Sequence, residues 1–172
     1  ACQLYAHRND VAFRVLRGNV GTRLSKLKRG EYDGIVLAYA GLKRLGLDEE
    51  LRREGLFVTP LASEWMLPAV GQAALAIEGS DRPDLRLVLK HFDHSVTRTC
   101  VAAERAFLRA MGGNCTTPIA ANARFESPMF VMDGAVFGLD GKHAFRRSVM
   151  QPCRTPAHLS SEAAEAIGTR LA

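Results

Sequence analysis

A single cysteine, Cys115, lies in a glycine-containing loop within the run MGGNCTTPI, residues 111–119. A helical pattern leads into the loop and a strand pattern leads out of it. Gly112 and Gly113 allow a sharp turn, and Pro118 stiffens the exit from the loop. Such a loop can present a thiol to a cavity, although an inert packed thiol is the more common state of a single cysteine. The residues alone predict a reactive or modified thiol. No histidine or aspartate partner is identifiable nearby in the sequence, so protease-like catalysis has little support.

A second candidate functional feature is the run RGNVGTRL, residues 17–24, which lies between a predicted strand and a predicted helix. Gly18 allows a ligand to come close, and the N–H groups at the start of a helix favour an anion. Arg17 and Arg23 can each bind a carboxylate or a phosphate with two donors. Arg44 follows the next predicted strand and is expected at the same edge of the sheet. The spacing of the turn alone fits a structural turn with surface arginines equally well, but three arginines at one edge favour a polyanionic ligand.

The chain of 172 residues carries a formal net charge of +5, and its excess of cations is concentrated in residues 8–53. Solvated helix faces, small polycarboxylates and nucleic acid are three explanations of this charge. Aromatic residues are sparse among the cations, and no helix-turn-helix or zinc-finger spacing occurs, so nucleic acid is the weakest of the three. The apolar fraction of 47% is typical of a globular protein. No apolar run is long enough to predict a membrane span.

The four cysteines are widely spread, without a CxxC pair, and the five histidines do not stand at ligand spacing from them. We therefore expect no metal site. No signal-peptide pattern is present at the start of the chain, so we expect reduced thiols and a cytoplasmic location. Cys100 lies on the apolar face of a predicted helix and is expected in the core.

Hydrophobic periodicity predicts an α/β half-domain followed by a small α+β domain. In the first part, buried strands are expected at 11–16, 34–38 and 56–60, with helices after the first two, and a further strand at 73–78. A strand–helix–strand order implies parallel pairing, with a ligand at the carboxyl ends of the strands. In the second part we expect helices at 83–92, at 95–111 with Ser95 as its cap, and from Ser160 or Ser161 to 171. Strands are expected at 119–125, 129–137 and 144–150.

Five motifs occur along the chain in an order that resembles the porphobilinogen deaminase (hydroxymethylbilane synthase) family. They are RGNVGTRL at 17–24, YDGIVLA at 32–38, AGLKRLG at 40–46, LPAVGQ at 67–72 and GGNCTTPI at 112–119. The resemblance spans nearly the whole chain. Asn114 stands where this family commonly has glycine, and Ala73 follows Gly71-Gln72 where the family usually has a second glycine.

The resemblance implies a transferase that joins four porphobilinogen molecules into hydroxymethylbilane, with release of ammonia, in tetrapyrrole biosynthesis (haem and chlorophyll). It implies a dipyrromethane cofactor, attached by a thioether to Cys115 and contacted by Arg17, Arg23 and Gly113. Arg17, Arg23 and Arg44 are the residues that would bind the substrate's carboxylates. No catalytic residue can be named in this chain. Porphobilinogen and the growing oligopyrrole are the expected partners, and neither nucleic acid nor a membrane is expected.

The family has three domains, the first two similar to periplasmic binding proteins. By resemblance, residues 1–65 are the later part of domain 2, residues 66–92 are the hinge and the return to domain 1, and residues 93–172 are domain 3. Most of domain 1 and the start of domain 2, including the aspartate credited with proton transfer, would then be absent. We expect the chain to be inactive alone and to self-associate through residues 73–77, whereas the family's full-length enzymes are usually monomers. The alternative is a non-enzymatic anion-binding module of periplasmic-binding-like fold.

Overall fold

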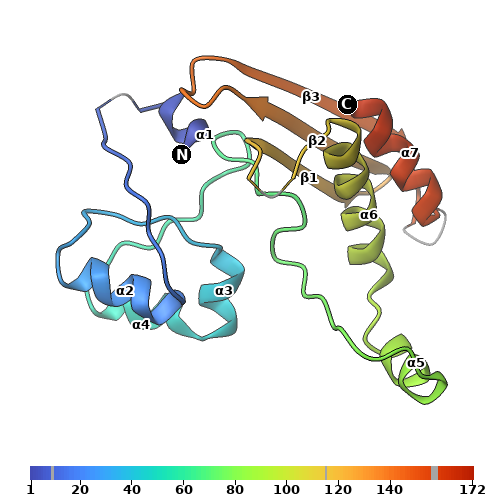
Figure 1. Ribbon diagram of the computed structural model, residues 1–172, viewed down its shortest axis with the longest axis horizontal. Coiled ribbons are helices and arrows are strands. Elements are labelled where there is room, and N and C mark those ends of the chain that lie inside the picture. Colours follow the sequence, from blue (N-terminus) through green and yellow to red (C-terminus); the bar gives the residue numbers. More distant parts are fainter. Residues whose placement is uncertain (9, 115, 156–158) are drawn as a thin grey trace. The chain divides into compact units, whose positions relative to one another are not determined.

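The computed structural model describes residues 1–8, 10–114, 116–155 and 159–172. The chain forms two compact units. One unit contains residues 1–7 and 63–172, and the other contains residues 8–62. Figure 1 shows the helices and strands of each unit, and the two are described separately here.

The unit of residues 8–62 is built on three short helices, α2 (Val20–Lys28), α3 (Tyr39–Arg44) and α4 (Leu47–Arg53). Each helix contributes one buried leucine to a shared core, namely Leu24, Leu42 and Leu51. Partly buried side chains from the connecting segments, among them Ile35, Leu37, Leu56 and Val58, pack around these leucines. The helix predicted after Asn19 is therefore confirmed, and its apolar stripe faces this core.

The structure corrects the strands predicted in this unit, because the described residues 10–62 contain no β-strand. Residues 11–16, 34–38 and 56–60 are connecting segments outside any strand ladder. Some of their apolar side chains remain exposed, as in Val15 (77%), Val36 (50%) and Phe57 (100%). A strand persists only where its N–H and C=O groups pair with a neighbour, and these segments pair with no strand of the described chain. The same holds for residues 73–78, where Leu75 is 75% exposed.

The unit of residues 1–7 and 63–172 contains the small α+β domain that the sequence predicts. Strands β1 (Ile119–Glu126), β2 (Met129–Phe137) and β3 (Ala144–Pro152) form an antiparallel sheet in the order β1-β2-β3. The register pairs Ala121 with Gly134, and Asp133 with Ser148. A turn at Ser127-Pro128 joins the first two strands, as predicted from the sequence.

Helices α6 (Ser95–Ala110) and α7 (Ser161–Leu171) cover one face of this sheet (Figure 1). The core between them includes Phe107, Phe130, Met132 and Ile167. The two helices approach closely at Gly168, where a Cβ atom would lie 2.0 Å from the carbonyl oxygen of Ala103. The helix pair therefore depends on the absence of a side chain at one position.

The first residues of α6 and α7 show whether the N-caps predicted for these two helices are correct. Ser160 caps α7, since its hydroxyl accepts a hydrogen bond from the N–H of Ala163 at 3.2 Å, as predicted. The cap of α6 is His94 rather than Ser95, because the helix begins at Ser95 and Nδ1 of His94 accepts from the N–H of Thr97 at 3.3 Å. The unit also contains α1 (Cys2–Tyr5) and α5 (Pro83–Lys90).

Residues 63–71, which include the first five residues of the LPAVGQ motif, are held by hydrogen bonds within the unit that contains the sheet. The guanidinium of Arg146 on β3 donates to the carbonyl oxygens of Ser63 at 2.8 Å and Glu64 at 2.6 Å. The side-chain amide of Gln3 donates to the carbonyl oxygen of Leu67 at 2.8 Å and accepts from its N–H at 2.9 Å. These contacts position the segment from two sides.

Two further contacts complete the attachment of this segment. The buried carboxylate of Glu104 on α6 accepts from the N–H of Gly71 at 2.7 Å and from the N–H of Ala123 on β1 at 2.9 Å. The rings of His7 and Trp65 stack with their centroids 4.7 Å apart. The segment therefore belongs to the same compact body as α6 and the sheet.

Candidate functional site

The turn before α2 has the geometry of an anion-binding helix start. Gly18 adopts a φ of +120°, and a Cβ atom there would lie 2.8 Å from Cγ2 of Thr22, so only glycine fits. The side-chain oxygen of Asn19 accepts from the N–H of Thr22 at 2.8 Å and from its hydroxyl at 2.9 Å. The helix thus begins directly after the glycine, and its first N–H groups lie at the turn.

The two arginines of the turn have different roles in it. Nε of Arg23 donates to the carbonyl oxygen of Gly18 at 2.8 Å, which holds this half-buried side chain against the turn. Arg17 is exposed, and its guanidinium makes no hydrogen bond or ion pair with the described residues. Nζ of Lys26 lies 3.4 Å from the carbonyl oxygen of Arg17 and adds a third cation, a contact that the sequence pattern did not indicate. Arg17 and Arg23 therefore flank the same turn, and their role in binding a ligand stays a prediction.

Arg44 lies in a different setting from the one predicted. It is the last residue of α3 and is exposed, whereas the sequence placed it after a strand at the edge of a parallel sheet. Helix α3 packs beside the start of α2, since a Cβ atom at Gly41 would lie 3.9 Å from Cγ2 of Val20. Arg23 and Arg44 lie on helices α2 and α3, and Arg17 lies in the turn before α2, so none of the three lies at the edge of a sheet.

The loop after α6 lies in the other unit. Cys115 lies outside the described residues, so its predicted role stays a prediction. Gly112 adopts a φ of +63°, as expected for the sharp turn. Gly113 allows close packing, because a Cβ atom there would lie 2.5 Å from Cδ1 of Ile119 and 2.8 Å from Cδ1 of Leu108. The loop is therefore packed against the end of α6 and the start of β1.

Side chains on both sides of position 115 are hydrogen-bonded to one another, a feature that the sequence analysis missed. The side-chain oxygen of Asn114 accepts from the N–H and the hydroxyl of Thr116 at 2.9 and 2.7 Å. The hydroxyl of Thr117 accepts from the N–H of Asn114 at 2.9 Å. Asparagine followed by threonines two and three residues later is a typical Asx-turn pattern, and this was the available signal.

The other cysteines are placed differently. Burial, and secondarily the charge of Glu104, raises the pKa of the Cys100 thiol to about 11, so this group stays protonated at neutral pH. Cys153 is buried, and its thiol donates to the carbonyl oxygen of Thr155 at 3.0 Å. Cys100 packs against the core, as the sequence predicted.

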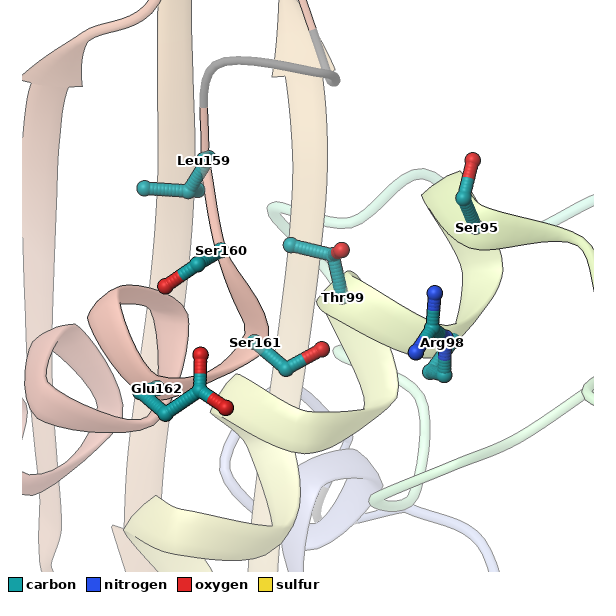
Figure 2. Close-up of a pocket in the computed structure, with 7 residues that line it drawn as sticks. All are labelled: Ser95, Arg98, Thr99, Leu159, Ser160, Ser161 and Glu162. Carbon is teal, nitrogen blue, oxygen red and sulfur yellow. The ribbon is translucent and has the colours of Figure 1, made fainter.

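The described residues contain no cluster of metal-ligating side chains and no helix long and apolar enough to cross a membrane. A cavity of about 320 Å³ lies between the starts of α6 and α7, as Figure 2 shows. Its lining comprises Ser95, Arg98, Thr99, Leu159, Ser160, Ser161 and Glu162. None of these is a predicted site residue, and the cavity pairs one cation with one carboxylate, so it does not match a polyanion.

Comparison with known proteins defines the class of protein. Residues 1–86 match a family model described as porphobilinogen deaminase, dipyromethane cofactor binding domain, and residues 98–172 match the porphobilinogen deaminase C-terminal domain. The chain therefore contains parts of two domains of one family, a cofactor-binding domain and a C-terminal domain. It belongs to the porphobilinogen deaminase family, as the sequence resemblance indicated, and dipyrromethane is the cofactor of that family domain.

Curated relatives agree with this assignment. The chain is 43% identical over 171 residues to a porphobilinogen deaminase of Neisseria meningitidis serogroup B, covering 99% of the chain and 50% of that protein. It is 39% identical over 172 residues to one of Coxiella burnetii strain RSA 331, covering 99% of the chain and 52% of the relative. The chain thus spans about half the length of the curated relatives it matches.

Proposed function

We propose that the chain forms part of a porphobilinogen deaminase and carries the cofactor thiol together with part of the carboxylate site. The activity is the joining of four porphobilinogen molecules into hydroxymethylbilane, with loss of ammonia, in tetrapyrrole biosynthesis. The main support is the match of both family domains in their order along one chain. The cofactor is proposed to be attached by a thioether to Cys115.

The residues of the turn fit a cofactor and a product that carry carboxylates. Each pyrrole carries an acetate and a propionate, so negative charge accumulates as the chain grows. The guanidinium of Arg17 makes no hydrogen bond or ion pair with the described residues, that of Arg23 is held by the carbonyl oxygen of Gly18, and both lie at a helix N-terminus. We assign cofactor and substrate carboxylates to these two arginines and further substrate carboxylates to Arg44. When bound, dipyrromethane supplies the pyrrole from which the product is extended.

Gly113 is also assigned to the cofactor site, and the chain is divided into the domains of the family. Gly113 leaves the loop without a side chain beside the cofactor. Domain 2 is assigned to residues 1–65, the hinge and return segment to 66–92, and domain 3 to 93–172. The exposed apolar residues Val15, Val36 and Phe57 support the proposal that their segments become strands of a periplasmic-binding-like sheet when partner strands are present. A cytoplasmic location accompanies the proposal.

No described residue is proposed as the proton-transfer group, so we expect the 172-residue chain to show no turnover by itself. Residues 73–77 are proposed to pair with a second copy, because Leu75 and Ile77 are exposed there. Turnover of porphobilinogen by the purified chain would contradict the first expectation. A strictly monomeric species in light scattering at high concentration would contradict the second.

The experiment that tests the function uses a chimera, in which this chain replaces the matching half of the Neisseria relative. Incubation with porphobilinogen should add the mass of two linked pyrroles to the peptide that contains Cys115. A Cys115→Ser chimera should remain unmodified and inactive. Anion binding by the chain, with no adduct on the wild-type chimera, would instead favour the anion-binding module.

A further inference from the structure

We infer that the cavity between the starts of α6 and α7 binds a small zwitterion of the α-amino acid class, with its carboxylate toward Arg98 and its ammonium group toward Glu162. The cavity lies within the unit of residues 1–7 and 63–172. None of its lining residues belongs to the motifs assigned to the cofactor or to porphobilinogen. The inference is therefore independent of the proposed function.

The hydroxyl of Thr99 on α6 is the first indication of a ligand. Thr99 lines the cavity and is only 4% exposed, yet its hydroxyl makes no hydrogen bond with the described residues. No polar side-chain atom is sealed in the described core without a partner, so this hydroxyl is open to the cavity. A threonine inside a helix commonly donates to the carbonyl oxygen four residues earlier, as Thr169 of α7 does to Glu165 at 3.0 Å. Because nearly all buried polar groups are hydrogen-bonded, Thr99 indicates a partner within the cavity.

The start of α6 supplies the positive side of the cavity. Ser95 is the first residue of this 16-residue helix, and its backbone N–H donates to no acceptor in the described part of the chain. Arg98 adds a guanidinium three residues further along. Nε of Arg98 lies 3.2 Å from a carboxylate oxygen of Asp93, and its two NH₂ groups make no hydrogen bond with the described residues. N–H groups at a helix start and a guanidinium together favour a carboxylate.

Glu162, in the first turn of α7, supplies the negative side. Its own backbone N–H, the hydroxyl of Ser160 and, to a smaller extent, the charge of Arg98 hold the pKa of this carboxyl below its ordinary value of 4.5, so it is ionised at neutral pH. Figure 2 shows the guanidinium of Arg98 on α6 and the carboxylate of Glu162 on α7, with the hydroxyl of Ser161 between them in this view. The two charges influence each other, but Arg98 forms its ion pair with Asp93 rather than with Glu162. A ligand that carries both a carboxylate and an ammonium group fits this arrangement better than a simple anion or cation.

The size and lining of the cavity agree with a small polar ligand. Its volume of about 320 Å³ is in the lower range of small-molecule sites. Four of its lining side chains carry hydroxyl groups, and Leu159 is the one apolar residue among the lining residues of the described chain. A ligand bound there would connect the starts of α6 and α7, so its binding should stabilise the unit against unfolding.

The first experiment measures thermal unfolding of the 172-residue chain through the fluorescence of its single tryptophan, Trp65, which lies in the same unit as the cavity. Each standard L-amino acid is added singly at about 10 mM, and at least one should raise the melting temperature by about 2 °C or more. The N-acetyl derivative and the methyl ester of the effective amino acid each lack one charge and should lose most of this shift. If no amino acid raises the melting temperature, or if acetate produces an equal shift, the inference is wrong.

Calorimetric titration of the effective amino acid into variants then locates its site. Thr99→Val removes the hydroxyl but keeps the shape of the side chain, and should weaken binding about fivefold without lowering the melting temperature of the unliganded chain. Arg98→Gln and Glu162→Gln should each weaken binding about tenfold or more. Thr169→Val and Glu165→Gln are the matched controls, because both residues lie outside the lining of this cavity, and they should bind like the wild type. Wild-type affinity in all five variants would place the ligand elsewhere and overturn the inference.

Discussion

The carboxylate of Glu104 and the backbone N–H of Gly71 form a hydrogen bond of 2.7 Å, although 33 positions separate the two residues in sequence. The second carboxylate oxygen accepts from the N–H of Ala123. Glu104 is only 7% exposed, so the bonds are shielded from water. One buried side chain therefore connects the segment of residues 63–71, helix α6 and the outer edge of β1.

Replacement of Glu104 by glutamine should destabilise this unit. The amide has one acceptor oxygen, so either Gly71 or Ala123 would face an NH₂ group and lose its bond. We expect a loss of about 2 kcal/mol in the free energy of unfolding, measured with urea. Glu165→Gln, at an exposed ion pair with Arg109, is the control and should change stability by less than about 0.5 kcal/mol.

The stability of the unit should also depend on pH through Glu104. Burial raises the pKa of its carboxyl above the ordinary 4.5, while the N–H groups of Ala123 and Gly71 act in the opposite direction. The folded state then holds a proton at pH values where the unfolded chain has released it. The contribution is full below about pH 4.5 and is lost as pH rises through the folded pKa. The stability of the wild type minus that of Glu104→Gln should decrease with pH in this window, and an increase would contradict the assignment.

Ala73→Gly should stabilise the protein. Ala73 has a φ of +73°, a left-handed conformation that costs an L-residue about 1 kcal/mol and costs glycine little. After the greater flexibility of glycine in the unfolded chain is subtracted, we expect a gain of about 0.5 kcal/mol by urea unfolding. Ala74→Gly, at a position without positive φ, should have the opposite sign. Equal destabilisation by both variants would show that the conformation of Ala73 carries no strain.

Gly168→Ala should be strongly destabilising. The new Cβ atom would meet the backbone carbonyl of Ala103 and the N–H of Phe107 on α6, neither of which can move without shifting the helix. Despite the better helix propensity of alanine, worth about 1 kcal/mol, we expect a net loss of about 3 kcal/mol. Gly79→Ala is the control, since its Cβ would make only ordinary contact with Leu89 at 3.7 Å. Similar melting temperatures for both variants would contradict the tight crossing of α6 and α7.

Alkylation of Cys100 should report its environment. With its thiol pKa raised to about 11, the rate should rise about tenfold per pH unit from pH ~7 to ~10. Glu104→Gln removes the negative charge that contributes to this pKa, so the profile should move to lower pH. Mass mapping of iodoacetamide-treated samples gives the rate for each cysteine. A rate that levels off near pH ~8 would show an ordinary exposed thiol.

The sequence predicted most of the α+β unit and helix α2, but the strands that it predicted in residues 8–62 are absent from the described residues there. In the sheet, neighbours in sequence pair through short turns, so apolar runs such as the one around Phe130 and Met132, bounded by turn residues, were enough to locate the strands. The segments that contain Val15 and Phe57 have similar apolar content, but strand formation there requires a distant partner, which a local pattern does not contain.

In the candidate site and its surroundings, too, the local features could be predicted from the sequence and the long-range contacts could not. The cap at Asn19 and its adjoining arginines follow from local spacing, and the structure reproduces both the cap and the turn. The bonds of Glu104 could not be predicted, because a glutamate on a helix is normally exposed and its partners lie far along the chain. His94 was missed as a cap because serine is the more common residue in that role.

The contact between the rings of His7 and Trp65 shows where the chain leaves and re-enters one of the two compact units. The chain leaves one compact body immediately after His7 and returns to it at residue 63, so both crossing points lie close together on that body. Residues 8–62 are therefore an insertion between two segments of the other compact unit. A short glycine linker in place of the insertion would leave the sheet, its two covering helices and the cysteine loop with an unbroken set of contacts.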